Sequence, residues 1–182
     1  LAQAAGVGAP ASHLVQPVTP AQQWACWAAA LGYPLFVKPL RAGSSFGISK
    51  VLSAHQLPAA LDAAFAYDDT ALRQEYIPGF EVGCALLGTH SLEAGRVDEI
   101  ELADGFFDFK EKYTLETASI HVPARITPEQ EAQVLQAAKT VYRALDCHGF
   151  ARVDLFCTPD GRVVFNEVNT IPGFTAHSRF PS

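Results

Sequence analysis

Two short strands joined by a tight turn constrain the fold of this chain more than any other feature. Residues 150–156 (FARVDLF) alternate apolar and polar side chains, and residues 163–169 (VVFNEVN) follow after the turn at 158–161. Side chains two residues apart share one face of a strand, and a turn of this kind folds two such strands into a hairpin. We therefore expect the hairpin to bring together one arginine, two carboxylates and one amide: Arg152, Asp154, Glu167 and Asn169.

This polar set has the composition of a magnesium–nucleotide site. Mg²⁺ takes hard oxygen ligands, usually one or two carboxylates with the remainder from water and substrate phosphate. Asp154, Glu167 and the amide oxygen of Asn169 would suit one or two such ions, and Arg152 would stabilise charge that develops on a transferred group. An Arg-x-Asp pair alone is more typical of an exposed ion pair that contributes little. The Glu-x-Asn on the partner strand is what favours the metal site.

Composition and charge place the chain among ordinary globular proteins. Of its 182 residues, 49% are apolar and 18% charged, and the net charge is −6, which argues against a nucleic-acid partner. No apolar stretch approaches the roughly 20 residues that span a bilayer, so we expect no membrane association. The absence of methionine and of a leader indicates an internal fragment of a longer polypeptide. Four scattered cysteines without a C-x-x-C pair are expected to be reduced core residues of a cytoplasmic protein: Cys26, Cys84, Cys147 and Cys157.

The periodicity of the chain predicts an α+β fold of two lobes with a boundary near Gly88. We expect strands at residues 33–37, 47–52, 72–77, 81–87, 96–102, 120–123, 150–156 and 163–169, and helices at 21–31, 54–66 and 127–145. The stretch 103–117 follows neither period and is rich in aromatic and charged residues. Such a stretch is typical of a functional loop.

Two further segments have features of nucleotide contacts. Lys38 ends a predicted strand and precedes a small-residue turn at 41–47 (RAGSSFG), whose backbone could approach phosphate oxygens. Without other evidence, this turn fits an ordinary hairpin loop as well as a phosphate-binding loop. In residues 74–81 two strands meet at Pro78-Gly79 with carboxylates on both sides. That arrangement suits a purine and a ribose, but also a hairpin with solvated acids.

In this order, the segments resemble the ATP-grasp D-alanine–D-alanine ligase family over nearly the whole chain, from about Ala5 to Pro181. The motifs that carry the resemblance are FVKPLRAGSSFG, QEYIPGFEVGCALLG, GFFDFKEKY, GFARVDLF and FNEVNTIPGFTAHSR. Within the family, EVGCALLG, RVDEIEL and HSRFP are most similar to vancomycin-resistance ligases, particularly those that make D-alanine–D-serine. The resemblance implies two α+β lobes whose antiparallel sheets enclose the nucleotide. Residues 1–88 would form the small lobe and 89–182 a truncated large lobe, with a lid at about 103–117 and no N-terminal substrate domain.

The resemblance also implies a function for individual residues. It assigns Lys38 to the phosphates, Glu81 to the ribose, and Phe106 and Phe156 to the two faces of the base. The complete set of expected ATP contacts is Lys38, Ser45, Gln74, Glu75, Ile77, Glu81, Phe106, Phe156 and Asn166. The expected ligands of two Mg²⁺ ions, with Mn²⁺ as an alternative, are Asp154, Glu167 and Asn169. Arg152 would stabilise the acyl phosphate and the tetrahedral intermediate.

The implied reaction needs a lid that excludes water. The carboxylate of the first D-alanine takes the γ-phosphoryl group of ATP, and the amine of the second substrate then attacks the carbonyl. An acyl phosphate would be hydrolysed in an open site, so a closed lid protects it. Lys112 would reach the γ-phosphate, and Tyr113 would turn toward Ser44 at the acceptor subsite.

The acceptor is expected to be bound by Gly173, Ser178 and Arg179, with Tyr113 nearby. The resistance branch carries arginine where D-alanine–D-alanine ligases usually carry leucine, and a cation suits an acceptor more polar than alanine. D-Lactate ligases lack the Lys-Tyr pair, which this chain keeps, so D-serine is favoured, with D-alanine and D-lactate as alternatives. His177 would shape the same subsite or serve as a packed structural histidine.

The resemblance places the full-length protein in the cytoplasm as a homodimer that makes peptidoglycan precursors and confers glycopeptide resistance. The chain itself could bind nucleotide yet turn over nothing, because the N-terminal domain is missing. A non-catalytic nucleotide-binding fragment is the alternative from another class. That alternative predicts the loss of at least one of six key residues, all of which are present: Lys38, Lys112, Arg152, Asp154, Glu167 and Asn169.

Overall fold

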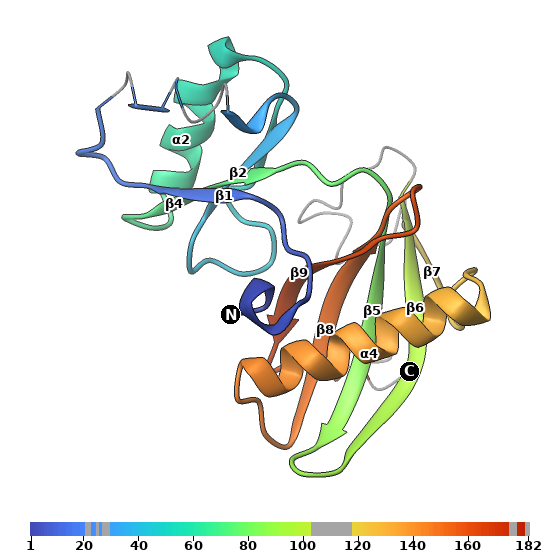
Figure 1. Cartoon of the computed structure of the whole chain (residues 1–182). Helices are drawn as coiled ribbons and strands as arrows, with labels where there is room; N and C mark the ends of the chain where they lie inside the picture. Colours follow the sequence, from blue (N-terminus) through green and yellow to red (C-terminus); the bar gives the residue numbers. More distant parts are fainter. Residues whose placement is uncertain (21–22, 25, 27–29, 103–117, 175–177, 181–182) are drawn as a thin grey trace. The chain divides into compact units, whose positions relative to one another are not determined.

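The computed structural model describes residues 1–20, 23–24, 26, 30–102, 118–174 and 178–180. These residues form two compact units, each of which is described by itself. Of the described residues, those at 1–9, 77–102, 118–174 and 178–180 belong to the first unit, and those within Pro10–Tyr76 belong to the second. Each unit has one antiparallel sheet with a helix packed on it (Figure 1). The α+β prediction is therefore confirmed.

The first unit contains a five-stranded antiparallel sheet in the order β7-β6-β5-β8-β9. Its strands are β5 (Phe80–Gly88), β6 (Leu92–Leu102), β7 (Ala118–His121), β8 (Phe150–Cys157) and β9 (Val163–Asn169). Helix α4 (Pro128–Ala144) lies across one face of this sheet (Figure 1). It begins at a capping box in which the Thr127 hydroxyl accepts from the backbone of Gln130 and the Gln130 side chain accepts from the backbone of Thr127.

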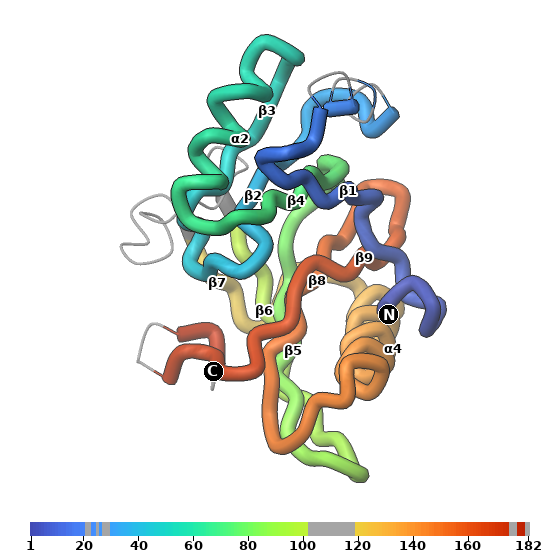
Figure 2. Tube along the Cα trace, turned by 90° about the vertical axis from the view of Figure 1, so that its left-hand side faces the viewer, coloured from blue at the N-terminus to red at the C-terminus, as the bar shows by residue number. Residues whose placement is uncertain are grey.

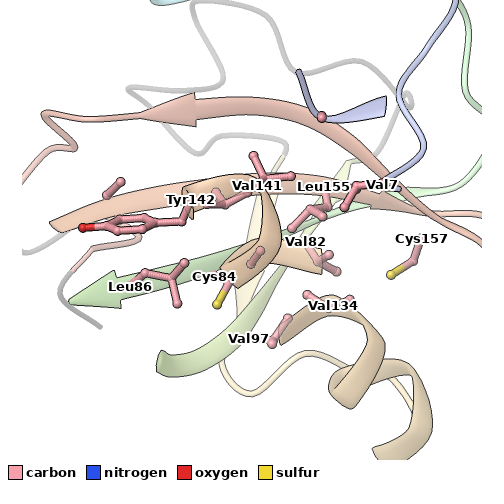
Figure 3. Close-up of a cluster of buried hydrophobic side chains, with 14 residues drawn as sticks. Val7, Val82, Cys84, Leu86, Val97, Val134, Val141, Tyr142, Leu155 and Cys157 are labelled. Carbon is pink, nitrogen blue, oxygen red and sulfur yellow. The ribbon is translucent and has the colours of Figure 1, made fainter. Parts of the chain in front are cut away.

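The buried core of this unit lies between α4 and the sheet (Figure 3). Every second residue of β5 and β8 points into it, and α4 contributes residues three or four apart, as the periods of strand and helix require. The members from these elements are Val82, Cys84, Leu86, Ala151, Val153, Leu155, Cys157, Val134, Ala138, Val141 and Tyr142. Because alternate residues of β5 and β8 are buried under α4, the intervening residues are displayed on the opposite face.

The second unit contains a four-stranded antiparallel sheet in the order β1-β4-β2-β3 (Figure 2). Its strands are β1 (Ser12–Val15), β2 (Leu35–Pro39), β3 (Ser49–Val51) and β4 (Ala71–Glu75). Helix α2 (Leu57–Phe65) follows a 3-10 turn, η2 (Ala54–Gln56), and packs on the sheet through Leu57, Ala60, Leu61 and Ala64. A second 3-10 turn, η1 (Gln3–Ala5), belongs to the first unit. The described residues within the predicted helix at 21–31 are helical.

The predicted boundary near Gly88 is wrong. Every residue of β5 is paired with β6, with β8 or with both, so the strand belongs to the first unit and the division falls at Tyr76/Ile77. Gly88 instead starts the tight connection from β5 to β6: its φ is 120°, and an added Cβ would lie 1.9 Å from the Ser91 carbonyl oxygen. In a sequence, a glycine in a hairpin turn cannot be distinguished from a glycine in a linker between domains.

The four cysteines carry free thiols, as predicted, but they do not all lie in the core. Cys84 and Cys157 are buried, whereas Cys147 is partly exposed and Cys26 is exposed. Cys26 follows Trp24 in a short apolar run, and apolar neighbours in a sequence do not determine which side of a helix a residue occupies. Among the described residues, no helix is both long and apolar enough to span a membrane.

Candidate functional site

The face of the five-stranded sheet opposite α4 carries a continuous set of polar residues. On β8, Arg152, Asp154 and Phe156 alternate with the core residues. Register aligns Arg152 with Asn169 and Asp154 with Glu167 on β9. Directly opposed residues of antiparallel strands share a face, so the hairpin joins the four polar groups as the sequence predicts.

Hydrogen bonds connect these four side chains directly. Arg152 Nε donates to Asp154 Oδ1 at 2.7 Å and Arg152 Nη2 donates to Oδ2 at 2.8 Å. The amide nitrogen of Asn169 donates to Asp154 Oδ2 at 2.8 Å and to Glu167 Oε1 at 3.2 Å. Asp154 is only 1% exposed, and a buried carboxylate of this kind needs such partners. The arrangement therefore fixes two carboxylates on either side of one amide.

A second arginine extends the polar network to β5 and β6. Arg179 Nη1 donates to Glu81 Oε1 at 2.7 Å, while Arg179 Nε and Nη2 donate to Asp98 Oδ1 at 2.9 and 2.7 Å. Its Nη1 also lies 3.5 Å from Asp154 Oδ1. The side chains of Arg179 and Asp98 are 6% and 5% exposed. This guanidinium is thus used within the protein, in contrast to the expected direct contact with an acceptor.

The sequence interpretation did not include Asp98 or Gly83 in the site. Gly83 faces Asp98 on β6 and Asp154 on β8, and an added Cβ would lie 2.2 Å from Arg179 Nη2. The missing side chain leaves the space in which Arg179 reaches Asp98. Both residues lie in motifs used for the family resemblance, EVGCALLG and RVDEIEL, but their contact depends on strand register.

The network carries an excess of negative charge. It contains four acids, Glu81, Asp98, Asp154 and Glu167, and two arginines, Arg152 and Arg179. Burial raises the pKa of the Glu81 carboxyl; Arg179 opposes this effect, and the charges of Asp154 and Glu167 add to it. A divalent cation would offset this repulsion.

The donor set fits such a cation. Asp154 and Glu167 supply carboxylate oxygens. Asn169 makes the two bonds described above through its amide nitrogen, and its amide oxygen Oδ1 takes part in neither. Each carboxylate oxygen has more than one lone pair, so the contact of Asp154 with Arg152 does not exhaust its capacity. No group of three or more His, Cys, Asp and Glu side chains among the described residues could hold a metal by itself. Two carboxylates and an amide match the partial protein coordination that is usual for Mg²⁺.

Other predicted nucleotide residues of the first unit flank this network. Phe156 is opposite Glu81 in the β5–β8 register, and Asn166 Nδ2 lies 3.5 Å from Glu81 Oε2. Ile77 is buried. At the predicted acceptor segment, Gly173 lies so close to Ser178 that an added Cβ would be 2.7 Å from its Oγ.

In the second unit, the predicted phosphate residues follow a strand end. Lys38 is on β2 opposite Leu72 of β4, and Ser44 and Ser45 in the following loop have positive φ angles of 54° and 59°. Gln74 and Glu75 end β4, and the Glu75 side chain accepts from the Ala11 backbone N–H at 3.0 Å. The Glu75 backbone N–H also donates to the Ala11 carbonyl oxygen at 2.8 Å, so Glu75 is bonded to Ala11 through both its backbone and its side chain.

Some predicted residues lie outside the described part of the chain. These are Phe106, Lys112 and Tyr113, in segment 103–117, and His177, in segment 175–177. Their predicted functions therefore stay predictions. The residues that the structure does bring together in the first unit are Glu81, Arg152, Asp154, Asn166, Glu167, Asn169 and Arg179.

Known proteins are similar to this chain in sequence and in fold. The chain is 50% identical over 151 residues to the vancomycin C-type resistance protein VanC1 of Enterococcus gallinarum. This match covers 83% of this chain and 44% of that protein. It is 45% identical over 152 residues to D-alanine–D-alanine ligase A of Escherichia coli K12, and this match covers 83% of this chain and 42% of that protein. The crystal structure of VanG D-Ala:D-Ser ligase from Enterococcus faecalis matches with a TM-score of 0.90 and 53% identity, over 99% of this chain and 52% of that one.

The chain spans about half the length of the proteins that it matches. Its agreement with the solved structures of VanG D-Ala:D-Ser ligase and of the D-alanine–D-alanine ligase from Coxiella burnetii confirms the predicted ATP-grasp fold. A family model described as D-ala D-ala ligase C-terminus matches residues 4–182. Because this match includes nearly every residue, the chain belongs to the D-ala D-ala ligase C-terminus family.

Proposed function

We propose that the protein containing this chain is an ATP-dependent ligase that joins D-alanine to a second D-amino acid through an acyl phosphate. The observation that carries the proposal is the set of Arg152, Asp154, Glu167 and Asn169 on adjacent strands of a chain from this family. The product would be a peptidoglycan precursor, made in the cytoplasm where ATP is available. The expected homodimer can be tested by light scattering.

The acids of the network would hold Mg²⁺, or Mn²⁺ in its place. Asp154, Glu167 and the Asn169 amide oxygen are the proposed ligands, and two ions are expected by analogy with the family. When bound, the metal would neutralise charge on the ATP phosphates and orient them. The excess negative charge of the network supports this proposal.

Arg152 would stabilise the negative charge that develops as the D-alanine carboxylate becomes an acyl phosphate and as the amine attacks it. Its bonds to Asp154 hold the guanidinium in one orientation before substrate binds, and preorganised charge of this kind stabilises a transition state without reorganisation. Catalysis would then come from positioning and charge stabilisation, and no covalent enzyme intermediate is required.

We propose D-serine as the acceptor. The VanG D-Ala:D-Ser ligase, at 53% identity, supports this choice. The matched proteins also include one named as a putative D-alanine–D-lactate ligase and several named D-alanine–D-alanine ligases, so these acceptors are the alternatives. Since Arg179 donates to Glu81 and Asp98, we propose that it acts on acceptor choice indirectly, by holding the neighbouring Ser178 in place.

An acceptor competition tests this function in the complete gene product that carries the chain. ATP, magnesium and D-alanine are supplied with equal D-serine and D-lactate, and the products are resolved by mass spectrometry. We expect mainly D-alanine–D-serine. Predominance of D-alanine–D-alanine or of the depsipeptide would keep the ligase assignment and reject D-serine. Nucleotide binding without ADP formation would reject the ligase assignment and favour a non-catalytic nucleotide-binding protein.

A further inference from the structure

The loop that follows Lys38 is attached at both ends to a single turn of the second unit. This loop, residues 40–47, leaves β2 where Pro39 is paired with Ala71 of β4. The turn at residues 67–70 connects α2 to β4 and ends just before Ala71. The Leu40 backbone N–H donates to the Thr70 carbonyl oxygen at 2.9 Å, so the pairing continues one residue beyond the strands.

Asp68 holds the first part of the loop. Its Oδ2 atom accepts from the Arg41 backbone N–H at 2.8 Å and from Arg41 Nε at 3.1 Å, and its Oδ1 accepts from Arg41 Nη2 at 2.6 Å. Oδ1 also accepts from the Thr70 backbone N–H at 3.0 Å. The Asp68 side chain is 3% exposed although Arg41 is 66% exposed. One buried carboxylate therefore joins the loop backbone, the loop side chain and the turn.

Tyr67 holds the last part of the loop. Its ring stacks on Phe46 with a centroid distance of 5.6 Å. Gly47, at a φ of 68°, packs so closely that an added Cβ would lie 2.8 Å from Tyr67 Cδ2 and 3.1 Å from the Ala63 carbonyl oxygen. The close approach explains why a residue without a side chain occupies position 47.

The backbone between these two attachments is strained. Ser44 and Ser45 are consecutive residues with φ angles of 54° and 59°, and a left-handed conformation costs a residue with a Cβ about 1–2 kcal/mol. Such strain persists only where the surrounding structure holds it. The attachments at Arg41 and at Phe46-Gly47 stand on either side of the two serines, and turn backbones of this kind can form concavities that bind anions.

We propose that Asp68 is a positioning residue for the nucleotide phosphates. By binding Arg41 it keeps the 40–47 loop, including the two left-handed serines, in the conformation that receives the phosphate of ATP. Asp68 does not touch the nucleotide. The inference rests on the proposed function, since it takes the phosphate of ATP as the ligand of this loop.

The test uses the complete gene product with Asp68→Asn and with Arg41→Lys. Asparagine keeps the shape of Asp68 but loses its charge, and lysine keeps the charge of Arg41 but loses the two-pronged contact. We expect Asp68→Asn to raise the KM for ATP by about 10- to 100-fold, the range in which misplaced binding groups act, with a smaller rise for Arg41→Lys. The KM for D-alanine should change less than about twofold, because the loop is proposed to contact only ATP.

The matched control is Asp160→Asn, which breaks an Asp–Arg pair with Arg162 in the β8–β9 turn. It should leave the KM for ATP unchanged. All assays are run well below the melting temperature of each variant, which is measured in parallel. A lower melting temperature for Asp68→Asn with an unchanged KM for ATP would overturn the inference, because Asp68 would then only stabilise the fold.

Failure of the proposed function would look different. If the wild-type protein forms no ADP with D-alanine, the affinity for the non-hydrolysable analogue AMPPNP with magnesium is compared by calorimetry. Weaker AMPPNP binding by Asp68→Asn than by wild type would support the proposal that Asp68 positions the phosphate loop, even though the protein is not a ligase. Equal affinity of wild type and Asp68→Asn would reject the positioning.

Discussion

Two arginine–carboxylate contacts, one in each unit, differ in their burial. In the first, Arg179 and its partner Asp98 are both buried, and the contact joins a C-terminal segment to strands β5 and β6. In the second, Arg41 is largely exposed and holds a loop to a turn through one buried acid. Loss of a buried contact leaves charge without water or a partner, whereas loss of the exposed arginine mainly frees the loop. Loss of the Arg179 contact should therefore lower folding stability, and loss of the Arg41 contact should lower ligand affinity.

The largest expected effect is that of Arg179→Ala on the free energy of unfolding. Removing the guanidinium leaves Asp98 and Glu81 without their counter-charge, and breaking a buried pair in this way costs about 3–5 kcal/mol. Urea denaturation of the complete gene product measures the difference. Gly83→Ala offers an independent route to the same contact, since its Cβ would fall 2.2 Å from Arg179 Nη2.

Gly83→Ala should destabilise the wild-type protein more than it destabilises the Arg179→Ala variant, because the tightest clash, with Arg179 Nη2, is absent from the variant, although the 2.8 Å approach to Asp98 Oδ1 remains. Equal costs of Gly83→Ala in both backgrounds would mean that the glycine serves another purpose. A loss below about 1 kcal/mol for Arg179→Ala would contradict the contrast between the two contacts, since that is the range of exposed pairs.

The next effect concerns the chemistry on the same polar face. Glu167→Gln removes one proposed metal ligand while keeping its size, and metal stabilisation of charge is worth several kcal/mol, so kcat should fall by about 10²- to 10³-fold. ADP release in the presence of D-alanine measures it. Glu129→Gln on the exposed surface of α4 is the control and should keep full activity. Retained turnover by Glu167→Gln would reject the metal assignment.

The sequence predicted local arrangements well and contacts between distant segments poorly. The hairpin of β8 and β9 was predictable because alternation and a four-residue turn together determine which side chains face each other. Helix α4 was predictable because Thr127 and Gln130 mark its start.

The missed parts of the site depend on register between strands. Gly83 meets Asp98 only through the pairing of β5 with β6, which shifts at a bulge between Cys84 and Leu86, and bulges have no reliable signal in a single sequence. Arg179 is 81 residues from Asp98. The start of β6 was also missed: residues 92–95 alternate between partly buried and exposed positions, but Gly95 interrupts the run, and glycine is uncommon inside strands. The expectation that Arg179 contacts the acceptor came from its position in a motif, which does not show what surrounds a side chain.

A pair with one buried and one exposed partner should show an intermediate effect that depends on pH. Glu99 accepts from the Arg125 backbone N–H at 2.8 Å and from Arg125 Nη2 at 2.6 Å. The hydrogen bonds from the Arg125 side chain lower the pKa of Glu99 below its ordinary value of 4.5. A lowered folded-state pKa stabilises the protein above the unfolded-state pKa, and this contribution is lost as the pH falls through the folded-state value.

Glu99→Gln should therefore cost about 1–3 kcal/mol near pH 7, the range for hydrogen bonds to a charged group. The difference from wild type should shrink below about pH 4.5. Urea denaturation at a series of pH values measures this, with the exposed Glu93→Gln on the same strand as the control. A gap that stays constant down to pH 3 would show that the charge of Glu99 is not what stabilises the contact.

The smallest effect should come from a pair in which both partners are exposed. Arg162 Nε donates to Asp160 Oδ2 at 2.7 Å, a distance as short as those of Arg179, but the two side chains are 62% and 60% exposed. Thr158 holds this turn without the arginine side chain: its backbone N–H donates to the Arg162 carbonyl oxygen, and its hydroxyl accepts from the Arg162 backbone N–H. Arg162→Ala should thus cost less than about 1 kcal/mol, and the difference should vanish in high salt, which screens exposed charges. Urea denaturation at low and high salt measures both values. A loss comparable to that of Arg179→Ala would mean that contact distance, rather than burial, determines what an arginine contributes to this protein.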